Sequence, residues 1–351
     1  MKKKSVLFFF IFTQLLFASY AYSAESISPT IAQMDKAELI IYGEPRRGGL
    51  IDRLNELETV LFGRSLPGSI AERQLQLLNF IQTGSAEQPS LLFKLGIAEW
   101  AVSQTTQPFI PALGRLQRLE QDLEGFIQEG NPVAMRVERV LAILLTDPVI
   151  QTELVVSSDR AIRAQFLEDI GPGKSRVGDS VKIEILEDFT MDNYLIAPRG
   201  SRIVAEVSGI RRPGLVGQAG EVRLDLKYLQ ILGPEELKVK VVDPERLGGR
   251  RGTGIATAAG VSIVGVALLG PVGLIPGLLI RGPSLDINAG TQFYIEMVED
   301  ARLSAFPIPP GLRRIDNFPD DRGGGGNVRS SGNVRDRVVH DDSDSDLFYL
   351  P

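Results

Sequence analysis

Three carboxylates close together in the sequence have the residue types that an acid–base reaction would need. Glu187, Asp188 and Asp192 flank a predicted turn between two strands. Two carboxyl groups are enough for a glycosidase, in which one acts as the acid and the other as base or nucleophile. A secreted hydrolase that cleaves surface polysaccharide through Asp188 and Asp192 is therefore one hypothesis. Few aromatic residues lie nearby to line a sugar-binding cleft, so we favour a protein that is not an enzyme.

The composition excludes several other catalytic sites. The chain has no cysteine, and its one histidine, His340, lies in the predicted disordered tail, so a Ser-His-Asp triad, a Cys-His pair or a multi-histidine metal site is not predicted. The glycine-rich stretch 248–254 precedes an apolar run and does not open a helix after a strand, so it does not predict a nucleotide site. The acidic run 341–346 lacks the spaced ligands of a calcium loop. We predict no cofactor and no metal.

The net charge and the N-terminus indicate an exported protein. A formal charge of -6 gives no basic face for nucleic acid, so none is predicted as a partner. Lysines at positions 2–4 precede an apolar stretch at 6–18, and small residues follow, which is typical of a secretory signal peptide over residues 1–24. Cleavage after Ala21 or after Ser23 fits the small-residue rule. An uncleaved anchor helix is the alternative, but the apolar stretch is shorter than a membrane-spanning helix.

Residues 34–160 show helical periodicity and an internal repeat. The pattern Arg-Leu-x-x-Leu-Glu-x-x-Leu-x-Gly begins at Arg53 and recurs 62 residues later at Arg115. Its leucines share one helical face, whereas Arg53 and Glu58 are predicted to lie off that face. Gly63 and Gly125 are predicted to end their helices as left-handed caps. We expect a helical domain of two ~62-residue repeats that stack to bury their leucines. A docking groove for a partner is the alternative.

The pattern changes to strands after a predicted linker at 161–176. In the predicted β-domain at 177–304, apolar residues alternate with polar ones, which indicates strands with one face on a core. Two turns look equivalent, 90 residues apart: one contains Pro198, Gly200 and Ser201, and the other contains Gly290 and Thr291. We predict that these residues have structural roles in the turns.

An uncharged apolar run of about 29 residues interrupts the β-domain. Its length exceeds the ~20 residues that span a bilayer. Proline at 271 and 276 predicts a break, so the expected structure is a helical hairpin over 252–280, with one long arm at 253–269. The hairpin could enter a membrane, pack on the protein itself or lie at a membrane surface. Its small-residue face and apolar neighbours are the predicted membrane or partner contacts: Gly252, Ala256, Gly260, Val264, Leu268 and Leu269.

Residues 305–351 are rich in Gly and Asp and are predicted to be a disordered tail. The fold class that follows from the whole pattern is α+β. It consists of an all-helical tandem-repeat domain and a β-barrel or sandwich-like domain with an inserted apolar helical hairpin.

Residues 178–298 resemble the C-terminal β-barrel domain of TrbI-type subunits of type IV secretion channels. The resemblance rests on Gly178-Asp179 before a strand, on Leu195-Ile-Ala-Pro-Arg-Gly-Ser-Arg-Ile203, and on a glycine-rich linker that leads into the apolar run. In that family the inserted segment forms an outer-membrane pore and the barrel docks in a ring. The resemblance implies an envelope β-barrel. This chain has a predicted cleavable signal where the family has an inner-membrane anchor.

These observations favour a non-enzymatic protein of a diderm cell envelope, located in the periplasm or the outer membrane. We expect a structural or assembly role, with a homo-oligomer or an envelope complex as its partner and a membrane contact through the apolar run.

Overall fold

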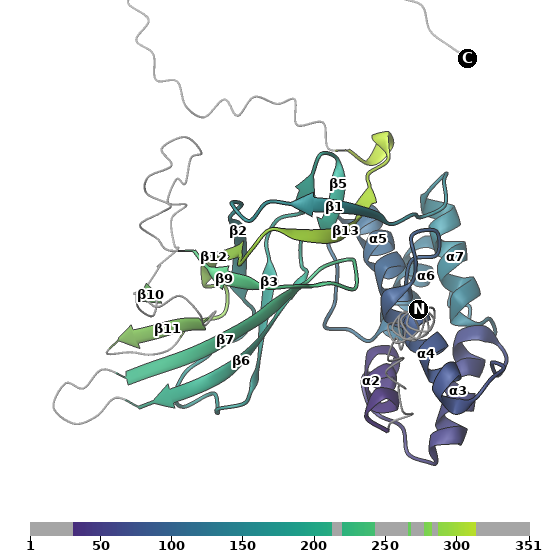
Figure 1. The fold of residues 1–351 in the computed structure, drawn as a ribbon, viewed down its shortest axis with the longest axis horizontal. Coiled ribbons are helices and arrows are strands. Elements are labelled where there is room, and N and C mark those ends of the chain that lie inside the picture. The colour runs from purple at the N-terminus through teal and green to yellow at the C-terminus, as the bar shows by residue number, and fades with distance from the viewer. Residues whose placement is uncertain (1–30, 213–219, 243–265, 268–276, 283–286, 314–351) are drawn as a thin grey trace, which may run out of the picture. The chain divides into compact units, whose positions relative to one another are not determined.

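In the computed structural model, the described residues are 31–212, 220–242, 266–267, 277–282 and 287–313. The described residues up to Leu312 belong to one compact unit. It has helices in its N-terminal half and strands after them, so the predicted α+β class is confirmed (Figure 1). The predicted signal peptide, the tail from 314 onward and the candidate contacts Gly252, Ala256, Gly260, Val264, Leu268 and Leu269 lie outside the described residues.

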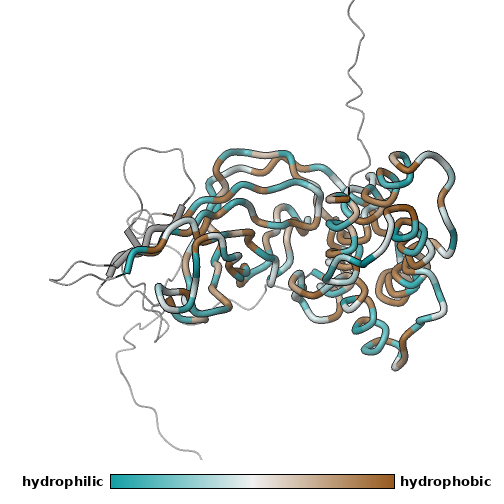
Figure 2. Tube along the Cα trace, turned by 90° about the horizontal axis from the view of Figure 1, so that it is seen from below, coloured by the Kyte–Doolittle hydropathy of each residue, from teal (hydrophilic) through white to brown (hydrophobic). Residues whose placement is uncertain are grey.

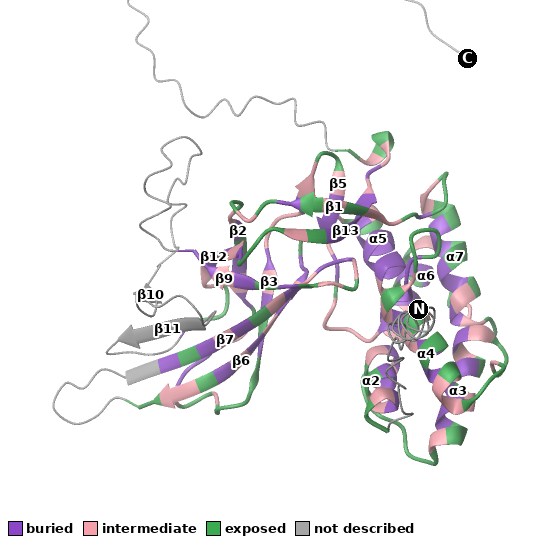
Figure 3. Cartoon of the chain, viewed as in Figure 1, coloured by how far each residue is buried: buried purple, intermediate pink, exposed green. Residues whose placement is uncertain are grey.

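Six α-helices lie in the described part, with a short π-helix at Asn79–Thr83 directly after α4. The α-helices are α2 (Ile31–Tyr42), α3 (Leu50–Phe62), α4 (Ile70–Leu78), α5 (Leu91–Ser103), α6 (Ala112–Glu124) and α7 (Val133–Leu144). Helix α5 is apolar almost all round, and nine of its first ten residues, all except Leu92, are buried, so it lies inside the helical core (Figure 3). No described helix is both long enough and apolar enough to cross a bilayer.

The helix ends follow the sequence signals. Gly63 and Gly125 have φ of 74° and 79°, and each donates its N–H to the carbonyl four residues earlier, so the predicted left-handed caps are confirmed. Helix α4 begins at a capping box in which Ser69 and Glu72 exchange hydrogen bonds. Position 63 requires glycine for a steric reason as well, because a Cβ there would lie 2.8 Å from Cγ of Pro132.

The strands form two sheets. A four-stranded sheet has the order β1-β13-β5-β4, and a larger sheet has the order β10-β11-β7-β6-β3-β2-β12-β9 with β8 beside β7. Their bounds are β1 Thr152–Val156, β2 Ile162–Phe166, β3 Ser180–Ile185, β4 Phe189–Met191, β5 Tyr194–Ala197, β6 Arg202–Arg211, β7 Gly220–Gln230, β8 Glu236–Leu237, β9 Val239–Val241, β10 Val266–Ala267, β11 Gly277–Gly282, β12 Gln292–Met297 and β13 Ala301–Pro307.

The larger sheet is barrel-like and nearly closed. Strands β8 and β9 are separated by one residue, and β8 pairs with β7 while β9 pairs with β12, so the sheet curves back toward its start. Apolar and polar residues alternate along the strands (Figure 2), as in β3, where Val181, Ile183 and Ile185 are buried. One face of each strand therefore forms the barrel core.

The small sheet lies between two cores. In β5, Leu195 joins the hydrophobic cluster of the helices, whereas its neighbour Ile196 joins the cluster of the barrel. In β13, Phe306 and Ala305 divide in the same way. Because successive residues of a strand point to opposite faces, both faces of this sheet are buried along β5 and β13, whereas Glu153 and Val155 of the edge strand β1 are exposed. The sheet thus joins the helical core to the barrel core.

Three predicted boundaries are wrong. Helix α7 ends at Leu144 and β1 begins at Thr152, so the helical region does not continue to 160. The predicted linker 161–176 contains strand β2, which pairs with β3 and β12. The tail does not begin at 305, because β13 continues to Pro307 and Ile308 is buried. The alternation in β1 and β2 is short, and the strands face a core supplied by distant segments, so the local pattern is weak.

The apolar run is described at two places only. Val266–Ala267 forms β10 and Gly277–Gly282 forms β11, and the two are antiparallel. The predicted helix over 253–269 is therefore wrong at Val266 and Ala267, which are strand. Strand β11 also pairs with β7, from Gly277 opposite Asp225 to Gly282 opposite Gly220. The C-terminal end of the run thus extends the larger sheet instead of returning as a helix.

Candidate functional site

The most elaborate polar arrangement in the described residues is a set of buried Glu–Arg pairs between successive helices. Each glutamate accepts two hydrogen bonds from one arginine, through Nε and Nη2, at 2.5–3.0 Å. Each also accepts the backbone N–H of the residue eight positions later. We call this arrangement a clamp. The clamps pair Glu38 with Arg53, Glu58 with Arg73, Glu99 with Arg115, and Glu120 with Arg136.

A clamp closes the loop between two helices. The planar guanidinium matches the carboxylate with two parallel hydrogen bonds, which fixes the angle between the helices. The loop N–H fills a remaining lone pair of the carboxylate, so little of the buried charge is left without a partner. Burial is nearly complete, since Glu58 is 0% exposed and Arg136 is 4% exposed. The expectation that Arg53 and Glu58 lie away from the buried face is therefore wrong. Both are buried, because Arg53 pairs with Glu38 and Glu58 pairs with Arg73.

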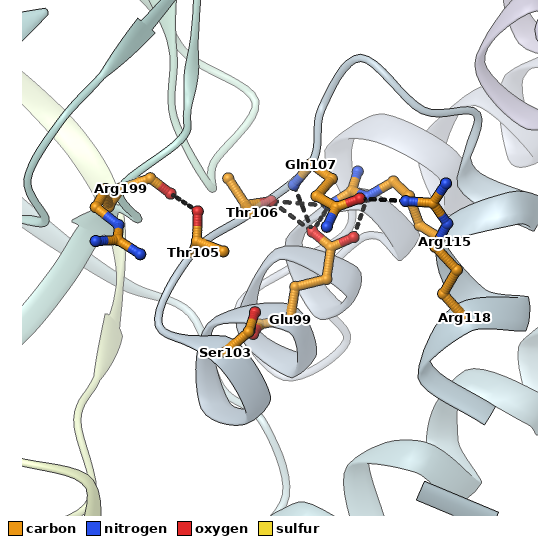
Figure 4. Close-up of polar contacts among 8 residues, drawn as sticks. All are labelled: Glu99, Ser103, Thr105, Thr106, Gln107, Arg115, Arg118 and Arg199. Carbon is orange, nitrogen blue, oxygen red and sulfur yellow. Dashed lines mark hydrogen bonds and ion pairs between the residues drawn. The ribbon is translucent and has the colours of Figure 1, made fainter. Parts of the chain in front are cut away.

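One clamp differs from the other three because its loop also touches the sheet. Glu99 lies on α5 and holds Arg115 of α6, the Thr106 hydroxyl at 2.6 Å and the N–H of Gln107 at 3.0 Å (Figure 4). In the same loop, Thr106 donates its N–H to the carbonyl of Arg199 at 2.9 Å, and the Thr105 hydroxyl donates to that carbonyl at 3.1 Å. Arg199 lies in the turn between β5 and β6.

A second contact connects α5 to the same turn. The indole Nε1 of Trp100 donates to Oδ2 of Asp188 at 3.0 Å, and Oδ1 of Asp188 accepts the N–H of Arg199 at 2.8 Å. We call the loop 104–111, Asp188 and the turn 198–201 the joint. It contains three residues that the sequence marked as structural, Pro198, Gly200 and Ser201. Thr106 of the joint and Trp100, which contacts the joint from α5, were not predicted, and no local pattern marks them.

The joint gives Asp188 a structural part. Both of its carboxylate oxygens accept hydrogen bonds from the protein, one from Trp100 and one from the backbone of Arg199, and these bonds hold the carboxylate in place at the joint. Asp192 lies in the tight turn between β4 and β5, where it and Asn193 both have positive φ. Such a turn is typical of a two-residue hairpin. The structure therefore offers no support for a catalytic pair made of Asp188 and Asp192.

The second predicted turn, at 288–291, has a similar backbone conformation but does not contact the loop 104–111. Gly290 has φ of 83°, against 85° at Gly200, and the N–H of Thr291 donates to Asn288 as that of Ser201 donates to Pro198. Gly290 is exposed, whereas Gly200 is buried against the loop 104–111. The two turns therefore share a conformation and differ in what they contact.

A cavity of about 310 Å³ lies elsewhere, at the start of β3. Its carboxylates are engaged with the protein: Asp169 accepts Lys174 Nζ and the N–H of Ala289, and Glu168 accepts the N–H of Lys182. The hydrogen bond from Lys174 and the N–H of Ala289 lower the pKa of Asp169. Among the described residues, no three His, Asp or Glu side chains are placed to hold a metal ion. The cavity therefore gives no defined ligand chemistry.

Comparison of the chain with family models, with curated proteins and with solved structures finds no match in any of the three.

The pKa of Glu99 gives a test of its clamp. Burial alone would raise the pKa of this carboxyl, but hydrogen bonds from Arg115, Thr106 and Gln107 outweigh burial and lower it below its ordinary value of 4.5. A lowered pKa in the folded state means that the stabilisation is present above about pH 4.5 and is lost as the pH falls through the folded-state value. We expect stability to fall more steeply below pH 4.5 in the unaltered protein than in Glu99→Gln. Chemical unfolding at a series of pH values measures this, and parallel curves would contradict it.

Proposed function

We propose that this chain is a non-enzymatic, exported protein of the bacterial cell envelope with a structural or assembly role. The observation that supports the proposal is that the buried glutamates of the helices pair with arginines and so hold neighbouring helices together. In the described residues, four buried glutamates each hold an arginine and a loop N–H, which fixes the geometry of the helices and gives these charges a structural role. Such an arrangement stiffens a scaffold that presents surfaces to a partner.

We further propose that the helical region is a tandem duplication. Helices α2, α3 and α4 would form one unit, and α5, α6 and α7 the other. The clamps support this, because the glutamates of α2 and α3 correspond to those of α5 and α6. In both units the last helix has leucine, Leu78 or Leu141, five residues after its arginine, where α3 and α6 have the clamp glutamate. The clamp series therefore ends at the same place in each unit.

The apolar run at 252–280 is the proposed contact with a membrane or with partner subunits. Strand β11 attaches its C-terminal end to β7, so the run is tied to the larger sheet. The resemblance of residues 178–298 to TrbI-type barrels supports an envelope setting and an assembly of several copies.

Fractionation of cells tests the proposal. The full chain is expected in the membrane fraction, or in a large assembly, when no detergent is present. A variant that lacks residues 254–276 keeps β11 and its pairing with β7, and it is expected in the soluble fraction at the size of a monomer. A variant that lacks 314–351 is the matched control and should behave like the full chain. The proposal is wrong if the full chain is already a freely soluble monomer.

A further inference from the structure

The contacts at the joint form a closed ring that begins and ends on neighbouring residues of one helix. Glu99 accepts hydrogen bonds from Thr106 and Gln107 of the loop, and the N–H of Thr106 donates to the carbonyl of Arg199. The N–H of Arg199 donates to Asp188, and Asp188 also accepts the indole N–H of Trp100, the residue after Glu99 on α5. A ring of this kind resists displacement in more than one direction, because any shift of the turn relative to α5 stretches at least one of its hydrogen bonds.

The loop 104–111 approaches the turn so closely at Gly200 that a side chain there would clash with it. A Cβ at this position would lie 2.5 Å from the carbonyl oxygen of Thr106 and 2.7 Å from the hydroxyl of Thr105. The first of these atoms belongs to the backbone and cannot rotate away. At Gly290, in the turn with the same φ, a Cβ would meet nothing within 4 Å. Glycine is therefore required at both positions by φ, and at Gly200 also by the approach of the loop.

The small sheet supplies a second connection between the helices and the barrel. Its two faces belong to the two hydrophobic clusters, through Leu195 and Phe306 on one side and Ile196 and Ala305 on the other. Displacing the helices from the barrel would expose one of these faces, which is unfavourable in proportion to the apolar area uncovered. The polar ring and the apolar sheet thus oppose the same motion.

We infer that the helical region and the barrel-like sheet move as one rigid body, and that Gly200 is the positioning residue that locks the joint. A displacement at the apolar run would then be carried through β7 and the turn 198–201 to the helices. This last step rests on the proposed function, whereas the locking of the joint does not. The inference differs from the linker that the sequence suggested at 161–176, which would let two domains move independently.

The single tryptophan of the chain reports on the joint directly. Trp100 is 2% exposed and its indole forms part of the ring. In full-length Gly200→Ala, local opening should raise the Stern–Volmer constant for acrylamide quenching of Trp100 by about threefold or more and move its emission to longer wavelength. Gly290→Ala carries the same backbone strain without the contact, so its quenching should match that of the unaltered protein. Equal quenching in the two variants overturns the inference.

A second measurement covers the case in which Gly200→Ala does not fold. The chain has no cysteine, so Thr105→Cys with Arg199→Cys introduces its only thiols. The Thr105 hydroxyl donates to the backbone carbonyl of Arg199 at 3.1 Å, so the two segments lie side by side, and we expect an intramolecular disulfide under mild oxidation in the folded protein. Thr105→Cys with Ala289→Cys places the second thiol in the matching turn and should not form one. Failure of the first pair to cross-link overturns the inference. Neither readout depends on membrane fractionation, so the two proposals fail separately.

Discussion

Replacing Arg136 with methionine is expected to lower the free energy of unfolding by about 3–5 kcal/mol, the range found when one partner of a buried ion pair is removed. Arg136 and Glu120 have side chains 5% and 1% exposed, and their two hydrogen bonds are 2.6 and 2.8 Å long. The variant leaves the Glu120 carboxylate buried with only the N–H of Gln128 as a partner. Unfolding in urea, followed by circular dichroism, measures the change.

Two further variants separate the clamp from the helix that carries it. Arg139 is three residues further along α7 and pairs with Glu124, but its side chain is 58% exposed. Arg139→Met should change stability less than Arg136→Met, because Arg139 is largely hydrated and Glu124, whose side chain is 7% exposed, keeps the hydrogen bond from the Gln128 side chain. Changing Arg136 and Glu120 together to methionine should restore much of the loss, since no charge is then left buried alone. A small effect of Arg136→Met would show that the clamp does not hold the helices.

Local patterns in the sequence predicted much of the fold. Alternation at Val181, Ile183 and Ile185 marks β3 because one face of that strand is buried along its whole length. Gly63 and Gly125 mark helix ends because few other residues accept a left-handed conformation. In each case the signal lies within a few residues of the feature that it predicts.

The joint and the clamps could not be predicted in the same way because their partners are distant. Glu99 and Arg115 recur in the repeat with Glu38 and Arg53, yet a charged residue in a helix is usually taken as solvated. Only the fold shows that each glutamate pairs with the arginine 15 or 16 residues later, which lies on the next helix. Trp100 and Asp188 are separated by 88 residues, and no spacing rule connects them. The one signal in the sequence that could have predicted these pairs is that the glutamate and the arginine both recur in the second repeat.

Replacing Phe166 with alanine tests whether residues 161–176 belong to the core. Phe166 ends β2, is 2% exposed, and lies with its ring 4.9 Å from that of Phe293 on β12. Removing the ring leaves a cavity between two paired strands, and truncation of a buried phenylalanine lowers stability by about 3–5 kcal/mol. A residue in a flexible linker would give almost no change. Thermal or urea unfolding distinguishes the two outcomes.

The neighbouring residue provides the matched control. Leu167 is 37% exposed and follows Phe166 directly, so Leu167→Ala alters the same stretch of backbone while removing few buried contacts. We expect its effect to be a minor part of that of Phe166→Ala, because the lost stability follows the apolar area that was buried. Equal effects at the two positions would mean that β2 is not packed in the barrel core. The helices would then be joined to the barrel by the small sheet and the joint without help from this strand.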